Sequence, residues 1–124
     1  MHAAVLERPG HPPVVVTGRE PPVAGPGEVV VDVVAAPITP LDLLCASGTS
    51  YFGVPRTPYV PGVQGIGTVR EALVWFPTTA GMGDGDGSMA ARAAAPRAGS
   101  SRCPPGAWTR QAAGAANGRI VLTP

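Results

Sequence analysis

Charged residues are scarce in this chain, and it has no long apolar run. Only 14% of its 124 residues are charged, and the formal net charge is +1. Nucleic acids and anionic membranes attract clustered basic residues, so nothing in the charge favours such a partner. No apolar run approaches the length of a membrane helix, and the start of the chain lacks the apolar core of a signal peptide. We therefore expect a cytoplasmic protein with neither a nucleic-acid nor a membrane partner.

Cysteine is also rare. The two cysteines, Cys45 and Cys103, stand far apart and form no metal-ligand pair of the C-x-x-C kind. A small secreted domain held together by disulfides would carry several pairs of cysteines. The sequence therefore predicts two free thiols in a reducing compartment and no metal site built on cysteine.

Glycine and proline, in contrast, are abundant, with 17 and 16 residues. Much of the excess lies after residue 77, so the chain divides there into two parts of different composition. A chain of this length can form one domain with one hydrophobic core. It is too short to hold a βαβ nucleotide-binding domain as well. We expect a barrel core over residues 1–77 and a Gly/Pro/Ala-rich loop and linker with one weak strand over residues 78–106. A short helix and a closing strand of the same domain are expected over residues 107–124.

The first part reads as short strands separated by turns. Strand candidates cover residues 3–6, 14–17, 65–69 and 73–76, and the strongest is residues 28–35, where valines occupy both faces and only Asp32 interrupts them. Pro37 and Pro40 are expected to interrupt pairing. Thr39-Pro40 is typical of a helix start, and the short helix would end near Gly48. These patterns predict a mainly β fold, a small antiparallel barrel with few helices.

The second part has weaker signals. Glycines alternate with other residues at 81–87 in what we interpret as a flexible surface loop. It is a poor phosphate loop, because Asp84 and Asp86 would repel phosphate and no helix pattern follows. Residues 97–106 read as linker. A helix at 107–116, a turn at Asn117-Gly118 and a strand at 119–123 complete the chain.

Four segments resemble the medium-chain dehydrogenase/reductase superfamily. Residues 1–7 are similar to its first strand, and PGEVVVDV at 26–33 is similar to its PGEVLVKV segment. AAPITPLDL at 35–43 resembles the NPxDL stretch of quinone oxidoreductases, and YVPGVQGIG at 59–67 resembles a P-G-x-E-x-x-G turn. The order and spacing of these segments match the family. The resemblance implies a GroES-like domain, a partly open β-barrel with one or two short helices.

The resemblance also implies a zinc-independent enzyme. Zinc alcohol dehydrogenases of this superfamily have Cys at the position of Thr39 and His-Glu at the positions of Val63 and Gln64. Threonine and valine cannot replace a thiolate and an imidazole as zinc ligands. The four-cysteine structural zinc lobe is absent as well. The chain is thus similar to quinone or enoyl reductases, which transfer hydride from NADPH to a quinone or an activated C=C bond.

Residues 117–124 resemble the last strand of the same enzymes, although the Rossmann domain of the family would precede that strand. No dinucleotide-binding motif is complete in this sequence. The resemblance implies NADPH as the cofactor, with the Rossmann domain supplied by a partner. A homo-oligomer through an exposed apolar barrel surface is the other partner that we expect. The alternative function is a non-catalytic GroES-like binding or scaffold module, or a degenerate remnant of such an enzyme.

Four residues are candidates for the site. Thr39 could hydrogen-bond to cofactor or substrate, or act only as a helix N-cap. Asp42 could orient catalytic groups, or only complement the helix dipole. Tyr51 could line the substrate site, or be a half-buried loop aromatic. Gln64 cannot act as a general base, and we expect it to form structural hydrogen bonds beside the substrate.

Overall fold

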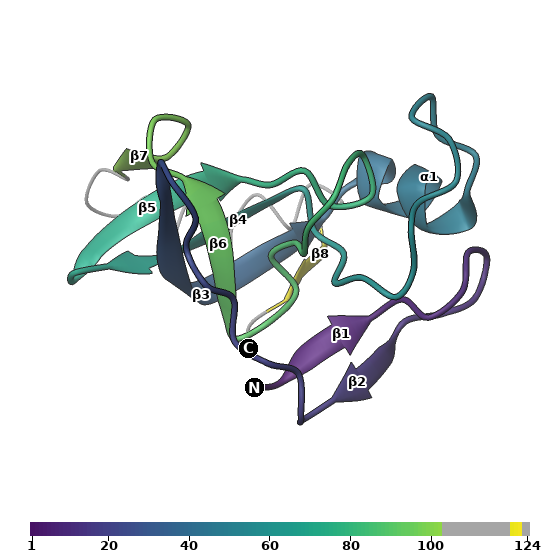
Figure 1. Cartoon of the computed structure of the whole chain (residues 1–124), viewed down its shortest axis with the longest axis horizontal. Helices are drawn as coiled ribbons and strands as arrows, with labels where there is room; N and C mark the ends of the chain where they lie inside the picture. The colour runs from purple at the N-terminus through teal and green to yellow at the C-terminus, as the bar shows by residue number, and fades with distance from the viewer. Residues whose placement is uncertain (103–119, 123–124) are drawn as a thin grey trace.

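The computed structural model describes residues 1–102 and the backbone of residues 120–122 (Figure 1). It consists of a two-stranded sheet, a six-stranded antiparallel sheet and one helix. The mainly β fold class predicted from the sequence is confirmed. The elements are β1 (Ala3–Val5), β2 (Val14–Val16), β3 (Glu28–Ile38), α1 (Pro40–Ser47), β4 (Gln64–Val69), β5 (Ala72–Pro77), β6 (Arg92–Pro96), β7 (Ser101–Arg102) and β8 (Ile120–Leu122). The predicted helix at 107–116, the predicted turn at 117–118 and Cys103 lie outside the described residues.

β3 is the central strand of the larger sheet. It pairs with β4, with β6 and, at its end, with β8, always antiparallel. Its valines alternate as predicted: Val31 and Val33 are buried, whereas Asp32 between them is exposed and forms an ion pair with Arg92. The inner face packs into one core cluster, whose buried members are Val31, Val33, Phe76, Ala93 and Ala95. Removing these apolar side chains from water is the main stabilisation of the sheet.

The expectation that Pro37 would interrupt pairing is wrong. β3 continues to Ile38, and Pro37 pairs with Val121 of β8. The register between β3 and β4 shifts between Val33 and Ala35, and the pairs between these two strands end at Ala35. Beyond that point β8 is the only strand paired with β3 among the described residues. A proline that lacks an N–H is tolerated at such an edge, because only one side of the strand needs a partner.

The structure also differs from the sequence-based prediction in the segment interpreted as a linker, residues 97–106. Ser101 and Arg102 form the short strand β7, which pairs with Trp75 and Val74 of β5. Both residues are exposed. A two-residue edge strand is held by backbone hydrogen bonds, so no alternation of apolar side chains marks it in the sequence. Within residues 78–106, where one weak strand was expected, β6 also forms, and its Ala93 and Ala95 belong to the same core as β3.

The smaller sheet contacts two loops, and these two loops also contact each other. β1 pairs with β2. Ala3 of β1 also forms a single bridge to Ala90, and Leu6, directly after β1, forms one to Tyr59. The loop before β4 and the glycine-rich loop before β6 approach so closely that a side chain on Gly87 would collide with the Gly62 carbonyl oxygen. Only the centre of the glycine-rich loop, residues 83–85, is exposed, because Gly87 is buried in this contact and Gly81 lies against Cys45 and Tyr59. In the described part of the chain, no helix has the length and apolarity needed to span a membrane.

Candidate functional site

The start of α1 carries two of the predicted site residues in a reciprocal hydrogen-bonded cap. The backbone N–H of Asp42 donates to Thr39 Oγ1 at 3.3 Å, and the backbone N–H of Thr39 donates to Asp42 Oδ2 at 2.8 Å. The Thr39 hydroxyl also donates to Asp42 Oδ2 at 2.9 Å. This capping box satisfies backbone donors that a helix start leaves free. Pro40 follows at the first helical position, where it needs no N–H. The N-cap interpretation of Thr39 is therefore confirmed.

Asp42 also ties α1 to the turn before β4. Its Oδ1 accepts from the backbone N–H of Val63 at 2.9 Å, and its side chain is buried. Both carboxylate oxygens are thus engaged within the fold. Because this one buried side chain connects the helix start to the turn, it fixes Thr39 and Gln64 in the same region of the molecule.

Gln64 lies at the first position of β4 and is half-buried. Its side-chain Oε1 accepts from Trp75 Nε1 at 2.9 Å, and its backbone carbonyl accepts from Ser88 Oγ at 2.6 Å. Its side-chain NH2 group has no hydrogen-bond partner in residues 1–102. A donor is therefore available on a side chain that Trp75 holds in place, one residue after the Val63 that Asp42 binds.

Tyr51 does not join this group. It is 98% exposed in the loop after α1, and its ring makes an edge-to-face contact with Phe52 at a centroid distance of 5.7 Å. The half-buried position considered for Tyr51 is therefore wrong. Its backbone turns outward after α1 ends at Gly48, which adopts a left-handed conformation (φ 79°). A role for Tyr51 in substrate binding stays a prediction.

Sequence reasoning missed a buried polar group beneath the cap. The Tyr59 hydroxyl is buried and has no hydrogen-bond partner among the described residues. A side chain on Gly81 would come within 3.1 Å of both Tyr59 Oη and Cys45 Sγ, so these two groups converge on one point. Burial, with smaller contributions from negative charge on Cys45 and Asp42, raises the pKa of Tyr59 to about 12. One signal was present in the sequence, because Asp42 and Cys45 are three residues apart and share a helix face.

Whether this chain can bind zinc depends on Thr39, Asp42 and Val63. Within residues 1–102, no group of three or more His, Cys, Asp or Glu side chains is arranged to hold a metal ion. Thr39 uses its hydroxyl in the helix cap, and Val63 offers no side-chain donor. Asp42 has both oxygens engaged in hydrogen bonds. The described donor set does not fit zinc, and independence from zinc stays a prediction.

The glycine-rich loop likewise does not fit a dinucleotide phosphate. Asp86 accepts hydrogen bonds from Arg19, at 2.8 to 3.2 Å, and from the backbone N–H of Val60 at 2.9 Å. Asp84 is exposed on the same loop beside Arg56. Two carboxylates occupy the region where a phosphate would need free amides. NADPH therefore has no complete site in the described residues.

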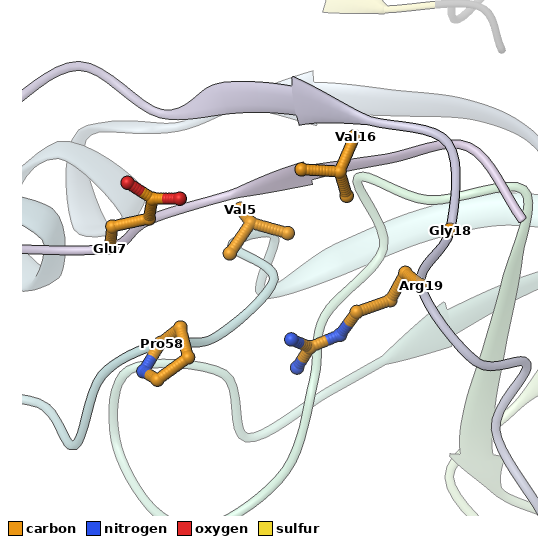
Figure 2. A pocket seen from close by; sticks show the side chains of 6 residues that line it. All are labelled: Val5, Glu7, Val16, Gly18, Arg19 and Pro58. Carbon is orange, nitrogen blue, oxygen red and sulfur yellow. The ribbon is translucent and has the colours of Figure 1, made fainter.

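Two cavities in the described structure lie away from the Thr39 cap. One, of about 470 Å³, opens beside the β1–β2 hairpin, with Glu7 on one side and Arg19 on the other (Figure 2). Its lining residues are Val5, Glu7, Val16, Gly18, Arg19 and Pro58. A second, of about 530 Å³, lies between the loop before β3 and the glycine-rich loop. Neither is lined by Thr39, Asp42, Tyr51 or Gln64.

Comparison with known proteins gives several similar solved structures. No family model matches the sequence, and no curated protein matches it. The quinone oxidoreductase from Thermus thermophilus, also solved with NADPH, is 29% identical with a TM-score of 0.75, and the match covers 86% of this chain and 33% of that one. An alcohol dehydrogenase superfamily protein from Novosphingobium aromaticivorans is 28% identical with a TM-score of 0.73, over 84% of this chain and 34% of that one.

A probable oxidoreductase from Mycobacterium abscessus is 28% identical with a TM-score of 0.71, over 85% of this chain and 35% of that one. This chain therefore spans about a third of the length of the solved structures that it matches.

Proposed function

Because this chain is a GroES-like domain of the medium-chain dehydrogenase/reductase superfamily, we propose that it forms the substrate-facing part of an NADPH-dependent quinone or enoyl reductase. The likeness to oxidoreductases supports an oxidoreductase domain. The substrate class is proposed from the Thermus enzyme and from the side-chain donors of Gln64. A nucleotide-binding domain from outside these 124 residues is proposed to complete the site.

The side-chain NH2 group of Gln64, which has no partner in the described part of the chain, is the observation that carries this proposal. A quinone or an enone carbonyl has only acceptor oxygens, so it needs a donor from the protein. The Gln64 side chain supplies two N–H donors, and Trp75 fixes its orientation. Thr39 cannot serve in this way, because its one hydroxyl proton already goes to Asp42. Thr39 keeps acceptor capacity only, which suits an N–H or O–H donor on a bound cofactor.

NADPH, held by the second domain, would supply the hydride, and the product's remaining proton would come from solvent. This chain's own contribution is to bind and orient the carbonyl oxygen. The Asp42–Val63 hydrogen bond keeps the helix cap and the turn together, so Gln64 and Thr39 stay in fixed relation during the reaction. No titrating side chain is needed for that role.

The test is a chimera with the Thermus quinone oxidoreductase, in which this chain replaces the equivalent catalytic segment. The folded chimera should oxidise NADPH in the presence of a quinone, whereas this chain alone should bind no NADPH at micromolar concentrations. Gln64→Met keeps the length of the side chain and removes its donors, so kcat/KM for the quinone should fall by about tenfold or more.

Trp75→Phe is the matched control. It removes the hydrogen bond that Trp75 Nε1 donates to Gln64 Oε1 but leaves the two N–H donors of Gln64 in place. It should therefore reduce kcat/KM much less than Gln64→Met does. A chimera that is folded and binds NADPH, yet reduces no quinone, would exclude the catalytic proposal.

That negative result would favour the second candidate, a non-catalytic binding module. One observation supports it: Thr39 and Asp42 use most of their polar groups to cap α1 and to hold Val63. Residues whose polar groups form hydrogen bonds within the fold can be retained for their structural role alone, without a catalytic function. Binding of a partner protein by the folded chimera, without turnover, would be the positive evidence for this function.

A further inference from the structure

The cavity beside the β1–β2 hairpin is not used by the proposed function. Its volume of about 470 Å³ falls within the ~300–1,000 Å³ that is typical of small-molecule sites. Thr39, Asp42 and Gln64 do not line it, so it is separate from the residues proposed to bind a quinone. Any ligand of this cavity must therefore be recognised by the cavity's own lining residues.

The apolar wall of the cavity comes from one face of the hairpin and from the loop before β4. The register of the β1–β2 pairs places Val5 and Val16 on the same face of the two-stranded sheet. Figure 2 shows both side chains projecting from the hairpin, with Pro58 across the cavity from Val5. A branched aliphatic group fits such a wall, because binding removes the apolar surface of both the ligand and the valines from water.

Arg19 supplies a fixed hydrogen-bond donor to the cavity. Its Nε and Nη2 donate to the Asp86 carboxylate at 2.8 to 3.2 Å, and the side chain is partly buried. Its Nη1 has no hydrogen-bond partner among residues 1–102, and Figure 2 shows the guanidinium pointing towards Pro58. Asp86 holds the guanidinium in place and offsets its charge, so Nη1 remains as a donor with little net attraction for an anion. A ligand oxygen, such as that of a carboxylate, can accept from it.

Glu7 is the unbalanced charge of the cavity. It lines the cavity just after β1 and forms no ion pair with any residue that the structure describes. Because the charges of Arg19 and Asp86 offset each other, the Glu7 carboxylate leaves the cavity with a net negative charge. The cavity therefore favours a ligand with an ammonium group and disfavours a ligand that carries only a carboxylate.

We propose that this cavity binds a zwitterionic α-amino acid with a branched aliphatic side chain. The ammonium group lies beside Glu7, and the carboxylate accepts from Arg19 Nη1. The aliphatic side chain covers the apolar wall of the hairpin. Because the cavity is open to solvent, a dissociation constant in the millimolar range is expected. The proposal is independent of the oxidoreductase function, since it requires neither a cofactor nor a second domain.

Amide NMR on the ¹⁵N-labelled whole chain tests the proposal, with the amides of Val16 and Gly18 as reporters in the cavity wall. L-Leucine should shift both signals saturably, with a dissociation constant of about 1–10 mM. 3-Methylbutylamine is leucine without its carboxylate, and it should bind more weakly because it cannot accept from Arg19. 4-Methylpentanoate is leucine without its amino group, and it should bind most weakly because Glu7 repels it.

Two variants locate the ligand, and each has a matched control. Glu7→Gln removes the charge and keeps the side-chain size, so it should weaken leucine binding by about three- to fivefold. Glu71→Gln, in the exposed turn between β4 and β5, should have no effect. Gly18→Leu should abolish binding: a Cβ at Gly18 meets no atom within 4 Å, so the fold accepts a side chain that then fills part of the cavity. Gly83→Leu, on the glycine-rich loop outside the cavity, should bind leucine as the parent chain does.

The amide spectrum also shows whether each variant is folded, and Gly18→Val replaces Gly18→Leu if that variant is not. The proposal is overturned if neither reporter shifts saturably up to roughly 50 mM leucine, or if the folded Gly18 variant binds as the parent does. Equal binding of leucine and 3-methylbutylamine would exclude the carboxylate contact and make the ligand a simple amine. Tighter binding of 4-methylpentanoate, or no effect of Glu7→Gln, would exclude the ammonium contact. None of these results depends on whether the chimera reduces a quinone.

Discussion

The two ends of this molecule distribute polar and apolar groups in opposite ways. Around β3 the interior is wholly apolar, and the charged pair Asp32–Arg92 lies on the exposed face. Around α1 the buried side chains include Thr39, Asp42 and Tyr59, while leucines and aromatic rings face solvent. The sheet end follows the rule that burial favours apolar groups. The helix end departs from it, which is typical of a surface made for binding.

The largest expected effect compares two phenylalanines. Phe76→Ala removes a fully buried ring from the sheet core and should lower the free energy of unfolding by about 3–5 kcal/mol. Phe52→Ala, at the helix end, removes a half-exposed ring and should change it by less than about 0.5 kcal/mol in the monomer. Urea denaturation of both variants measures the difference. Equal losses would mean that Phe52 belongs to a core of its own.

A smaller effect compares two aspartates. Asp42→Ala leaves the buried N–H of Thr39 and the partly buried N–H of Val63 without an acceptor, so it should cost about 2–3 kcal/mol. Asp32→Ala removes an exposed ion pair with Arg92 and should cost less than about 1 kcal/mol. The two midpoints of thermal unfolding test this ranking. If Asp32→Ala were the more harmful, the cap at α1 would not be what joins the helix to the sheet.

The last comparison depends on pH and belongs to Tyr59. The pKa of this hydroxyl rises from an ordinary 10.0 to about 12 on folding, so the folded state prefers the neutral form. Its contribution to stability is complete below pH 10, and is lost at about 1.4 kcal/mol per pH unit as the pH rises from 10 towards 12. Tyr59→Phe should remove this part of the alkaline destabilisation.

Tyr51→Phe is the control for that experiment, since it changes the same residue type in the exposed loop. It should leave the alkaline loss of stability as it is in the parent chain. If both variants showed the same pH profile, Tyr59 would not be the group that titrates.

Much of the fold could be predicted because its signals are local. The alternation of valines in residues 28–35 predicted β3, and Thr39-Pro40 predicted the start of α1. Pro37 and Ser101–Arg102 were misjudged for the opposite reason. Whether a proline or a polar pair can lie in a strand depends on which neighbours occupy the sheet edge, and that is a property of the assembled sheet.

The candidate site was predicted in part. Thr39, Asp42 and Gln64 were identified from the resemblance, and the Thr39 cap also follows from its own sequence signature. The Asp42–Val63 bond joins residues 21 positions apart, so no local pattern could reveal it. The same holds for Tyr59 and Cys45, which meet near Gly81 only because three separate segments converge there.

The sequence by itself determined the mainly β class, the helix cap and the likeness to oxidoreductases, because each rests on residues that are neighbours in the chain. Tertiary structure alone decided which donors stay free. Within residues 1–102 the Gln64 NH2 group has no partner, whereas Asp42 and Thr39 use their groups within the fold. Hydrogen bonds between distant segments form only when the sheet brings those segments together. It also decided that the apolar side chains of α1 face outward, because the buried face of that short helix carries Asp42 and Cys45.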